Sequence, residues 1–377
     1  MNKKVLIIGG VAGGASAAAR LRRLDENAQI IMFERGEYIS FANCGLPYYI
    51  GETIKERDNL LVQTPEAMMG RFNIDVRVNS EVASINTKEK KVTVNSKEKG
   101  NYEETYDYII MSPGATPIKP PIEGINSSKI FTLRNIPDTD RIKDYVDNKN
   151  VKSAVVVGGG YIGIEMAENL RERGINVVLV EAAPHILAPF DSDMVTFAEQ
   201  ELQENGVGLI LGDGVKSFEE NNNKIKISLQ SNTELNADMI ILAIGVKPDT
   251  EFLKGSSIEI GPRGHIIVDK HMKTNVEGIY AVGDAIEVID YINENKTAIP
   301  LAGPANKQGR IAADNLCGLN SSYKGTQGTA IIKVFGLTGG STGNNERILS
   351  KFNIPYKVVY TPVSYTHLRA HETLANI

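Results

Sequence analysis

The sequence is poor in cysteine and has no tryptophan: its 377 residues include two cysteines, Cys44 and Cys317. A disulfide-stabilised secreted protein of this length would need more, so that class is excluded and a reducing compartment is favoured. No apolar run reaches the roughly 18 residues of a membrane-spanning helix. The first residues, MNKKVLIIGG, do not have the pattern of a signal peptide. We therefore expect a cytoplasmic protein without a membrane partner.

An excess of positive charge is also missing. The chain has 41 Lys and Arg residues against 46 Asp and Glu residues, which gives a net charge of −5. Nucleic-acid binding usually leaves a basic surface, so we expect no nucleic-acid partner. The composition, 42% hydrophobic and 23% charged, is typical of soluble globular proteins, and the length predicts two or three domains.

Glycine is abundant, and the first glycine-rich turn follows the apolar run Val5–Ile8. An alanine-rich stretch with a helical pattern comes directly after this turn. In the dinucleotide fingerprint G-x-G-x-x-G, Gly9 and Gly14 fit, whereas Val11 occupies the middle position. The next apolar run ends at Glu34, where an acid that binds a ribose is expected. The pattern predicts a strand, a helix and a strand around a nucleotide.

The second glycine turn matches the same fingerprint fully. Gly158, Gly160 and Gly163 follow the strand pattern Ala154–Val157, and the next predicted strand ends at Glu181. Glycines at these positions let the backbone approach a pyrophosphate at a helix N-terminus. A terminal acid binds a ribose 2′-hydroxyl and repels a 2′-phosphate, so the pattern favours NADH over NADPH.

A third signal, TNVEGIYAVGDAIE, places Gly283 and Asp284 after a short apolar run. Two further glycine turns, at Gly114 and Gly245, look like the passages from one nucleotide unit to the other and back. Ligands bind at the carboxyl ends of such strands. Two dinucleotide sites in one chain imply electron transfer between two cofactors.

The stretch SFANCGLPYYIG, residues 40–51, contains Cys44. Tyr49 stands where a C-x4-C motif would have its second cysteine. A single thiolate can still carry redox chemistry, either as a mixed disulfide with a small thiol or as a sulfenic acid. The residues alone leave both chemistries open.

These motifs, in this order, resemble the pyridine nucleotide–disulfide oxidoreductase family. The flank F-A-N-C-G-L-P-Y and the turn GGVAGGASAAARLRRL are similar to its single-cysteine coenzyme A-disulfide reductases. The resemblance implies an α/β fold with two Rossmann-like FAD/NAD(P)-binding domains of the three-layer ββα type, plus the truncated start of an α+β dimerisation domain. The implied boundaries are 1–118 and 250–324 for a split FAD domain, 119–249 for the NAD(P)H domain and 325–363 for the start of the dimerisation domain.

The resemblance also implies roles for individual residues, with Cys44 as the catalytic thiol. FAD is assigned to Gly9, Gly14, Glu34, Arg35, Gly114 and Asp284. NADH, with NADPH as the alternative, is assigned to Gly158, Gly160, Tyr161, Gly163, Glu181 and Gly245. Coenzyme A is assigned to Ser16, Arg20, Arg23, Ser40 and Asn43.

The implied activity is the NAD(P)H-dependent reduction of coenzyme A disulfide, or of a coenzyme A persulfide or polysulfide, by a homodimer. An alternative is an NADH oxidase or peroxidase that uses a sulfenic acid at Cys44. A second alternative is a truncated FAD-binding fragment, or an electron carrier to a protein partner. Cys317, in a helical and apolar context, is interpreted as structural.

The end of the chain, SYTHLRAHETLANI, does not fit this family. His367 and His371 lie four residues apart, but the H-E-x-x-H pattern of zinc enzymes and a third ligand are missing, so we expect no metal site. Residues 364–377 are interpreted as a non-native read-through. Before them, 328–343 and 356–364 have the pattern of strands.

Overall fold

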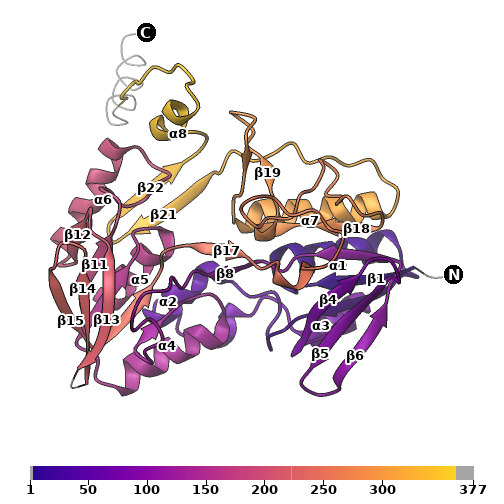
Figure 1. Cartoon of the computed structure of the whole chain (residues 1–377), viewed down its shortest axis with the longest axis horizontal. Helices are drawn as coiled ribbons and strands as arrows, with labels where there is room; N and C mark the ends of the chain where they lie inside the picture. The colour runs from indigo at the N-terminus through magenta and orange to yellow at the C-terminus, as the bar shows by residue number, and fades with distance from the viewer. Residues whose placement is uncertain (1–2, 222, 362–377) are drawn as a thin grey trace, which may run out of the picture. The chain divides into compact units, whose positions relative to one another are not determined.

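A computed structural model describes residues 3–221 and 223–361. The chain divides into two compact units, residues 1–343 and 344–377. The larger unit contains two five-stranded parallel sheets, which confirms the predicted α/β fold with two Rossmann-like halves (Figure 1).

The first sheet has the strand order β18-β7-β1-β2-β3. Its strands are β1 (Lys4–Ile8), β2 (Gln29–Phe33), β3 (Asp75–Arg77), β7 (Tyr108–Met111) and β18 (Ile279–Ala281). β18 pairs with β7 although some 170 residues of sequence separate them. The third glycine signal therefore lies in the same sheet as the first.

The second sheet repeats this arrangement, with the order β12-β11-β10-β16-β9. Its strands are β9 (Ile130–Phe131), β10 (Ser153–Val157), β11 (Asn176–Glu181), β12 (Gly208–Leu211) and β16 (Met239–Leu242). Strands that are buried on both faces consist of continuous runs of Val, Ile and Leu. This is why the sequence pattern predicted β1 and β10.

Each parallel sheet is accompanied by a three-stranded antiparallel sheet. These are β4 (Ser80–Asn86), β5 (Lys91–Ser96) and β6 (Gly100–Thr105), and β13 (Val215–Asn221), β14 (Lys224–Leu229) and β15 (Glu234–Ala237). The two passages between the halves, β8 (Ala115–Pro117) and β17 (Val246–Pro248), pair antiparallel with each other. Two short hairpins complete the sheets: β19 (Val288–Ile289) with β20 (Lys296–Thr297), and β21 (Ala330–Val334) with β22 (Leu337–Ser341).

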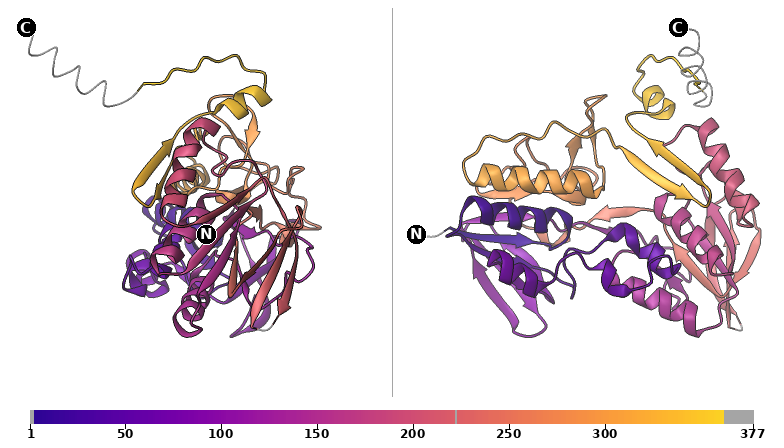
Figure 2. Two further views of the ribbon diagram at one scale, coloured as in Figure 1. Left: turned by 90° about the vertical axis from the view of Figure 1, so that its left-hand side faces the viewer. Right: turned by 180° about the vertical axis from the view of Figure 1, so that it is seen from behind.

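The helices of the larger unit are α1 (Ala12–Leu24), α2 (Leu46–Ile50), α3 (Pro65–Phe72), α4 (Ile136–Asn148), α5 (Tyr161–Glu172), α6 (Ser192–Glu204) and α7 (Ala302–Leu316). Short 3₁₀ turns lie at Asn43–Gly45, Arg57–Leu60, Glu251–Leu253 and Gly283–Ala285. α7 runs alongside α1 (Figures 1 and 2). Gly309 allows this close packing, because a side chain there would clash with the carbonyl of Gly13.

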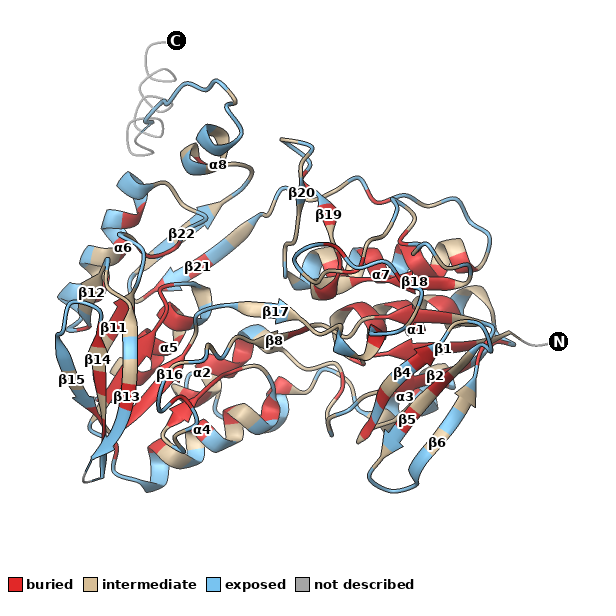
Figure 3. Cartoon of the chain, viewed as in Figure 1, coloured by how far each residue is buried: buried red, intermediate tan, exposed pale blue. Residues whose placement is uncertain are grey.

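The buried side chains concentrate on the parallel strands and on the helices that cover them (red in Figure 3). One cluster joins β1, β2, β7 and β18 to α1 and α7. A second cluster joins β10 and β16 to α4, α5 and α6. Leu46 and Ile50 of α2 belong to this second cluster, although α2 lies only 13 residues after β2 in the sequence.

The hairpin of β21 and β22 bears out the strand pattern of residues 328–343. Ile332 and Val334 are buried in the cluster of α5 and α6, at 2% and 1% exposure. The strand pattern of residues 356–364 was wrong for its described part, because residues 356–361 form no strand. These residues are exposed, and none of the sheets in the described part of the chain includes them, whereas pairing with a neighbour is what stabilises a β-strand.

The smaller unit contains one described helix, α8 (Glu346–Lys351). The side chain of Asn345 caps it by accepting a hydrogen bond from the backbone N–H of Ile348, at 3.1 Å. His367, His371 and the remainder of the 364–377 tail lie outside the described residues. Within the described residues, no helix is long and apolar enough to cross a membrane, and no group of three or more His, Cys, Asp or Glu residues could hold a metal ion.

Candidate active site

The two glycine turns have the same internal geometry. Gly9 and Gly158 have φ values of +92° and +112°, which favour glycine. A side chain at either position would clash with a backbone carbonyl of the neighbouring strand exit, that of Ser112 or Ala243. Both turns therefore need glycine to bring strand and helix together.

In each turn the third fingerprint glycine packs directly against the backbone of the first. A Cβ at Gly14 would clash with the carbonyl of Gly9, and a Cβ at Gly163 would clash with that of Gly158. The middle position is different, because a Cβ at Gly160 would meet open space. Val11 stands at this position in the first turn, where it precedes α1 and is partly exposed. The departure from the fingerprint thus leaves the fold of the turn unaffected.

The predicted acids lie at the carboxyl ends of their strands and accept hydrogen bonds from the glycine turns. Glu34 accepts a hydrogen bond from the backbone N–H of Gly10 at 3.0 Å. Glu181 accepts one from Gly159 at 2.6 Å and another from Ala183 at 2.7 Å. Each carboxylate is thereby held at the edge of its glycine turn, at the carboxyl end of its sheet.

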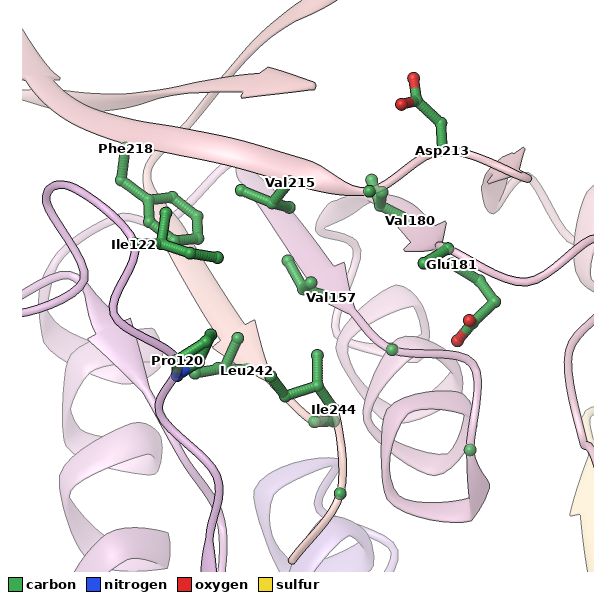
Figure 4. Close-up of a pocket in the computed structure, with 16 residues that line it drawn as sticks. Pro120, Ile122, Val157, Val180, Glu181, Asp213, Val215, Phe218, Leu242 and Ile244 are labelled. Atoms are coloured by element: carbon green, nitrogen blue, oxygen red, sulfur yellow. The ribbon is translucent and has the colours of Figure 1, made fainter. Parts of the chain in front are cut away.

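A cavity of about 500 Å³ opens beside the second turn (Figure 4). Gly158, Gly160, Glu181 and Gly245 line it, so the structure brings together four of the residues predicted for NADH. Tyr161 and Gly163 do not line this cavity; they lie in the first turn of α5.

The far wall of the cavity comes from residues that the sequence did not single out. Pro120, Ile122 and Phe218 supply apolar contacts. The Asp213 carboxylate binds the hydroxyl of Ser231 at 2.6 Å, and in Figure 4 it points away from the Glu181 carboxylate. Pro120 and Ile122 follow β8, Asp213 lies between β12 and β13, and Phe218 lies in β13. No nucleotide motif marks these residues.

Gly114 and Asp284, both predicted for FAD, meet around Arg134. The Arg134 guanidinium donates to Asp284 at 3.0 Å, and a Cβ at Gly114 would lie 3.0 Å from the same nitrogen. Arg134 was not predicted as a site residue, because in the sequence it is simply a basic residue shortly after the strand β9. Arg35 forms an ion pair with Asp249, whose backbone N–H donates to the carbonyl of Gly114 at 3.0 Å.

Cys44 lies in the 3₁₀ turn Asn43–Gly45, with its side chain exposed. The start of its segment is fastened to the first glycine turn, because Ser40 donates its backbone N–H to the carbonyl of Gly10 at 2.9 Å. Ser40 adopts a φ of +45°, which is unusual for a residue with a side chain. The chain therefore turns sharply between the first nucleotide turn and the thiol.

The helix after Cys44 packs against α4 and α5 of the second half. Arg57 holds the segment to α4 through two hydrogen bonds to Asp140, at 2.8 and 2.7 Å. Arg173 donates to the carbonyl of Ile50 at 3.0 Å. The thiol is thus positioned by the first half at one end of its segment and by the second half at the other.

The residues predicted for coenzyme A do not form one cluster of free groups. Ser16 donates to Asn306 at 2.8 Å, and Arg20 donates to Asp314 at 2.7 Å, so both bind side chains of α7. Arg23 lies over the ring of Phe72, and Arg71 lies over the same ring. Asn43, next to the thiol, has a buried amide oxygen without a hydrogen-bond partner in the described chain.

The electrostatics around the thiol disfavour its ionised form. Although Cys44 is exposed, the surrounding protein atoms and then the Glu165 carboxylate raise the pKa of its thiol. Burial, with Glu168 as a second cause, raises the pKa of Glu165 itself to about 7. Cys317 lies at the end of α7, and burial raises its pKa as well.

Comparison with known proteins identifies the family. Residues 3–309 match the model of the pyridine nucleotide-disulphide oxidoreductases. The chain belongs to this family. Membership of this family makes the chain a flavin-dependent disulfide oxidoreductase.

Individual proteins of known name and structure show which members of the family this chain is similar to. The coenzyme A disulfide reductase of Staphylococcus haemolyticus is 36% identical over 93% of this chain and 79% of that protein. The crystal structure of reduced Bacillus anthracis CoADR-RHD is 53% identical with a TM-score of 0.93, covering 95% of this chain. This chain spans 65% of the length of that structure's chain. The NADH-bound water-forming NADH oxidase of Lactobacillus brevis is 30% identical with a TM-score of 0.89, over 94% of this chain and 78% of that one.

Proposed function

We propose that this chain uses NADH and FAD to reduce coenzyme A disulfide, or a coenzyme A persulfide or polysulfide, through a mixed disulfide at Cys44. One observation carries the proposal: a single exposed thiol lies between the two nucleotide-binding halves, four residues after a backbone hydrogen bond to the first glycine turn. The identity to coenzyme A disulfide reductases supports the choice of substrate.

The residues of the first half suit FAD. Gly9 and Gly14 let the strand, the turn and α1 pack closely, as a pyrophosphate site at a helix N-terminus requires. Glu34 stands where a ribose hydroxyl would bind, and Asp284 with Arg134 presents paired charges at the end of β18. A flavin held there supplies the two-electron transfer between nicotinamide and disulfide. We accordingly propose the domain division 1–118 with 250–324, and 119–249, which agrees with β18 pairing in the first sheet.

The residues of the second half suit NADH. The cavity beside Gly158 and Gly160 is concave and mostly apolar, and Glu181 lies at its rim. A carboxylate at this point accepts hydrogen bonds from a 2′-hydroxyl and repels a 2′-phosphate. Its two backbone hydrogen bonds fix it there.

The chemistry at Cys44 needs no second protein cysteine. The thiolate attacks one sulfur of the disulfide, a Cys44–substrate disulfide forms, and one thiol leaves. The unpaired amide oxygen of Asn43 is available to an N–H of the substrate's pantetheine arm, and Arg23 is available to its phosphates.

Two measurements test the proposal. Mass spectrometry of the non-reduced protein should find a coenzyme A adduct on Cys44; an added oxygen without an adduct would favour the sulfenic acid of an oxidase or peroxidase. NADH oxidation is then followed with coenzyme A disulfide, glutathione disulfide, peroxide and oxygen in turn. Turnover with coenzyme A disulfide that disappears in Cys44→Ser is the expected result. A Cys44→Ser variant with undiminished turnover would point to an electron carrier instead.

A further inference from the structure

The loop that follows β11, residues 182–187, packs against the second glycine turn; we call it the β11 loop. Leu187 of this loop donates its backbone N–H to the carbonyl of Gly159 at 2.8 Å. Ile186 is 1% exposed and fills the space beside the same glycine, because a Cβ at Gly159 would lie 2.7 Å from Cγ2 of Ile186. The β11 loop therefore contacts Gly159 through both its backbone and a side chain.

The same glycine holds the carboxylate at the rim of the cavity. The backbone N–H of Gly159 donates to Oε2 of Glu181 at 2.6 Å. The backbone N–H of Ala183, which belongs to the β11 loop, donates to Oε1 of Glu181 at 2.7 Å. One of the two donors is thus part of the β11 loop and the other is in contact with it. A movement of the loop must therefore change the position of the Glu181 carboxylate.

The β11 loop has a strained backbone. Leu187 has a φ of +46°, in the left-handed region that a residue with a side chain rarely adopts, and its side chain is 3% exposed. Such a conformation persists only where the surrounding contacts impose it. The contacts that anchor the loop therefore decide whether it keeps this shape.

Glu199 of α6 supplies an anchor from outside the glycine turn. Its Oε1 accepts a hydrogen bond from the backbone N–H of Ile186 at 3.3 Å and lies 3.1 Å from Nδ1 of His185. The Glu199 side chain is only 13% exposed. Val195 and Leu202 of the same helix are buried in the core of the second half, which fixes α6 in place. One carboxylate on a fixed helix thus binds two consecutive residues of the β11 loop.

We propose that Glu199 is a positioning residue for the nicotinamide nucleotide: it holds the β11 loop against the glycine turn and so keeps the Glu181 carboxylate where a ribose hydroxyl binds. This role rests on the proposed function, which assigns NADH to the cavity beside Gly158. Glu199 does not line the cavity, so it acts on the nucleotide through the loop and not by contact. The position of Glu181 matters because a hydrogen bond weakens steeply when its geometry is distorted.

Glu199→Ala should weaken nucleotide binding and leave the later steps unchanged. Without the carboxylate, the strain at Leu187 is released by movement of the β11 loop, and Glu181 loses its fixed position. The KM for NADH, and the Kd for NAD+ measured by calorimetry on the holoenzyme, should both rise about three- to ten-fold, the factor that one lost hydrogen bond gives. The kcat should stay at the value of the parent chain.

The conservative variant and a neighbouring acid provide the comparisons. Glu199→Gln keeps an oxygen that accepts the N–H of Ile186, so its KM and Kd should return close to those of the parent chain. Glu204 is an exposed acid on the same helix that accepts a hydrogen bond from Gln200. Because Glu204 has this partner on α6 itself, Glu204→Ala should leave both constants unchanged.

A double variant tests whether Glu199 acts through Glu181. Glu199→Ala should shift the ratio of kcat/KM for NADH and NADPH toward NADPH, because the repelling charge is displaced. Glu181→Gln removes that charge, so adding Glu199→Ala to it should change the ratio no further. Independent, additive shifts in the double variant would overturn the route through Glu181.

Hydrogen–deuterium exchange reads the loop without turnover or bound nucleotide. The N–H of Leu187 is protected by its bond to Gly159. In Glu199→Ala this amide should exchange about tenfold faster, because the β11 loop opens locally more often. In Glu204→Ala it should exchange at the rate of the parent chain.

The proposal is overturned if Glu199→Ala keeps the KM for NADH of the parent chain, or if its kcat and flavin absorbance fall together with binding, as general damage would produce. Should Glu199→Ala not fold, Glu199→Asp replaces it: the shorter side chain withdraws the carboxylate from Ile186, and an unchanged KM in this variant overturns the proposal. A parent chain that binds neither NADH nor NADPH would refute the proposed function. Exchange at Leu187 would then still decide whether Glu199 holds the loop, and an unchanged rate in Glu199→Ala would refute that as well.

Discussion

The ammonium group of Lys333 lies 3.3 Å from Oε1 of Glu168, whose side chain is 1% exposed. This ion pair joins the hairpin of β21 and β22 to α5, the helix that also carries Glu165. The second carboxylate oxygen, Oε2 of Glu168, is buried without a hydrogen-bond partner in the described chain. The hairpin therefore neutralises part of a charge that is buried on α5.

Replacing Lys333 by methionine should destabilise the protein at alkaline pH and have little effect at pH 4. Burial raises the pKa of Glu168 in the folded chain, and Lys333 counteracts that shift. A carboxyl group with a raised folded pKa opposes folding as the pH rises above its unfolded pKa of about 4.3. Because Lys333 is 54% exposed, we expect a loss of only about 1 kcal/mol at pH 8, measured by urea denaturation.

Lys254→Met is the control for that experiment. Lys254 pairs with Glu251 on the surface, where both side chains are largely exposed, and its loss should leave stability unchanged at either pH. An equal destabilisation of Lys333→Met at pH 4 and pH 8 would show that the side chain acts through packing and not through charge.

The fingerprint glycines Gly160 and Gly163 should respond differently to alanine. In Gly163→Ala the new methyl group meets the carbonyl of Gly158, so the turn must shift, and we expect a loss of about 1–3 kcal/mol in stability. In Gly160→Ala the methyl group meets open space beside the cavity, so the melting temperature should be kept and the KM for NADH should rise. Thermal melts and NADH titrations separate these effects; equal destabilisation by both would contradict the geometry.

Glu181→Gln should shift the coenzyme preference toward NADPH. The amide keeps an oxygen for one of the backbone N–H groups but loses the charge that repels a 2′-phosphate. We expect about a tenfold change in the ratio of kcat/KM for NADH and NADPH, equivalent to about 1.4 kcal/mol. Asp213→Asn is the control, because its carboxylate points away from Glu181 and should leave the ratio unchanged (Figure 4).

Arg23→Ala should distinguish coenzyme A disulfide from pantethine, the disulfide that lacks the nucleotide. If the guanidinium beside Phe72 binds the phosphates, the KM for coenzyme A disulfide should rise about tenfold while that for pantethine stays the same. Arg22 provides the contrast, because its guanidinium binds backbone carbonyls, including those of Phe72 and Asn73. Arg22→Ala should lower stability without changing the preference, and equal KM changes for both substrates in Arg23→Ala would refute phosphate binding.

Local signals were sufficient to predict the nucleotide turns. A glycine with positive φ, an apolar β-branched strand before it and an acid at the end of the next strand are each determined by neighbours within about 25 residues. This is why Gly9, Gly158, Glu34 and Glu181 could be named from the sequence. Arg134 and Phe218 could not, because their positions depend on how separate loops meet, and a single arginine or phenylalanine carries no local pattern.

The sequence by itself determined the two parallel sheets, the two glycine turns and the presence of one thiol without a nearby second cysteine, because hydrophobic period, glycine and chain order act locally. Only the tertiary structure decided which charges surround that thiol. Glu165 stands 121 positions after Cys44, and its carboxylate raises the pKa of that thiol because α2, which buries Leu46 and Ile50 in the core of the second half, packs against α5. The packing of buried apolar surfaces determines which residues far apart in the sequence lie near each other. No local sequence pattern indicates such contacts.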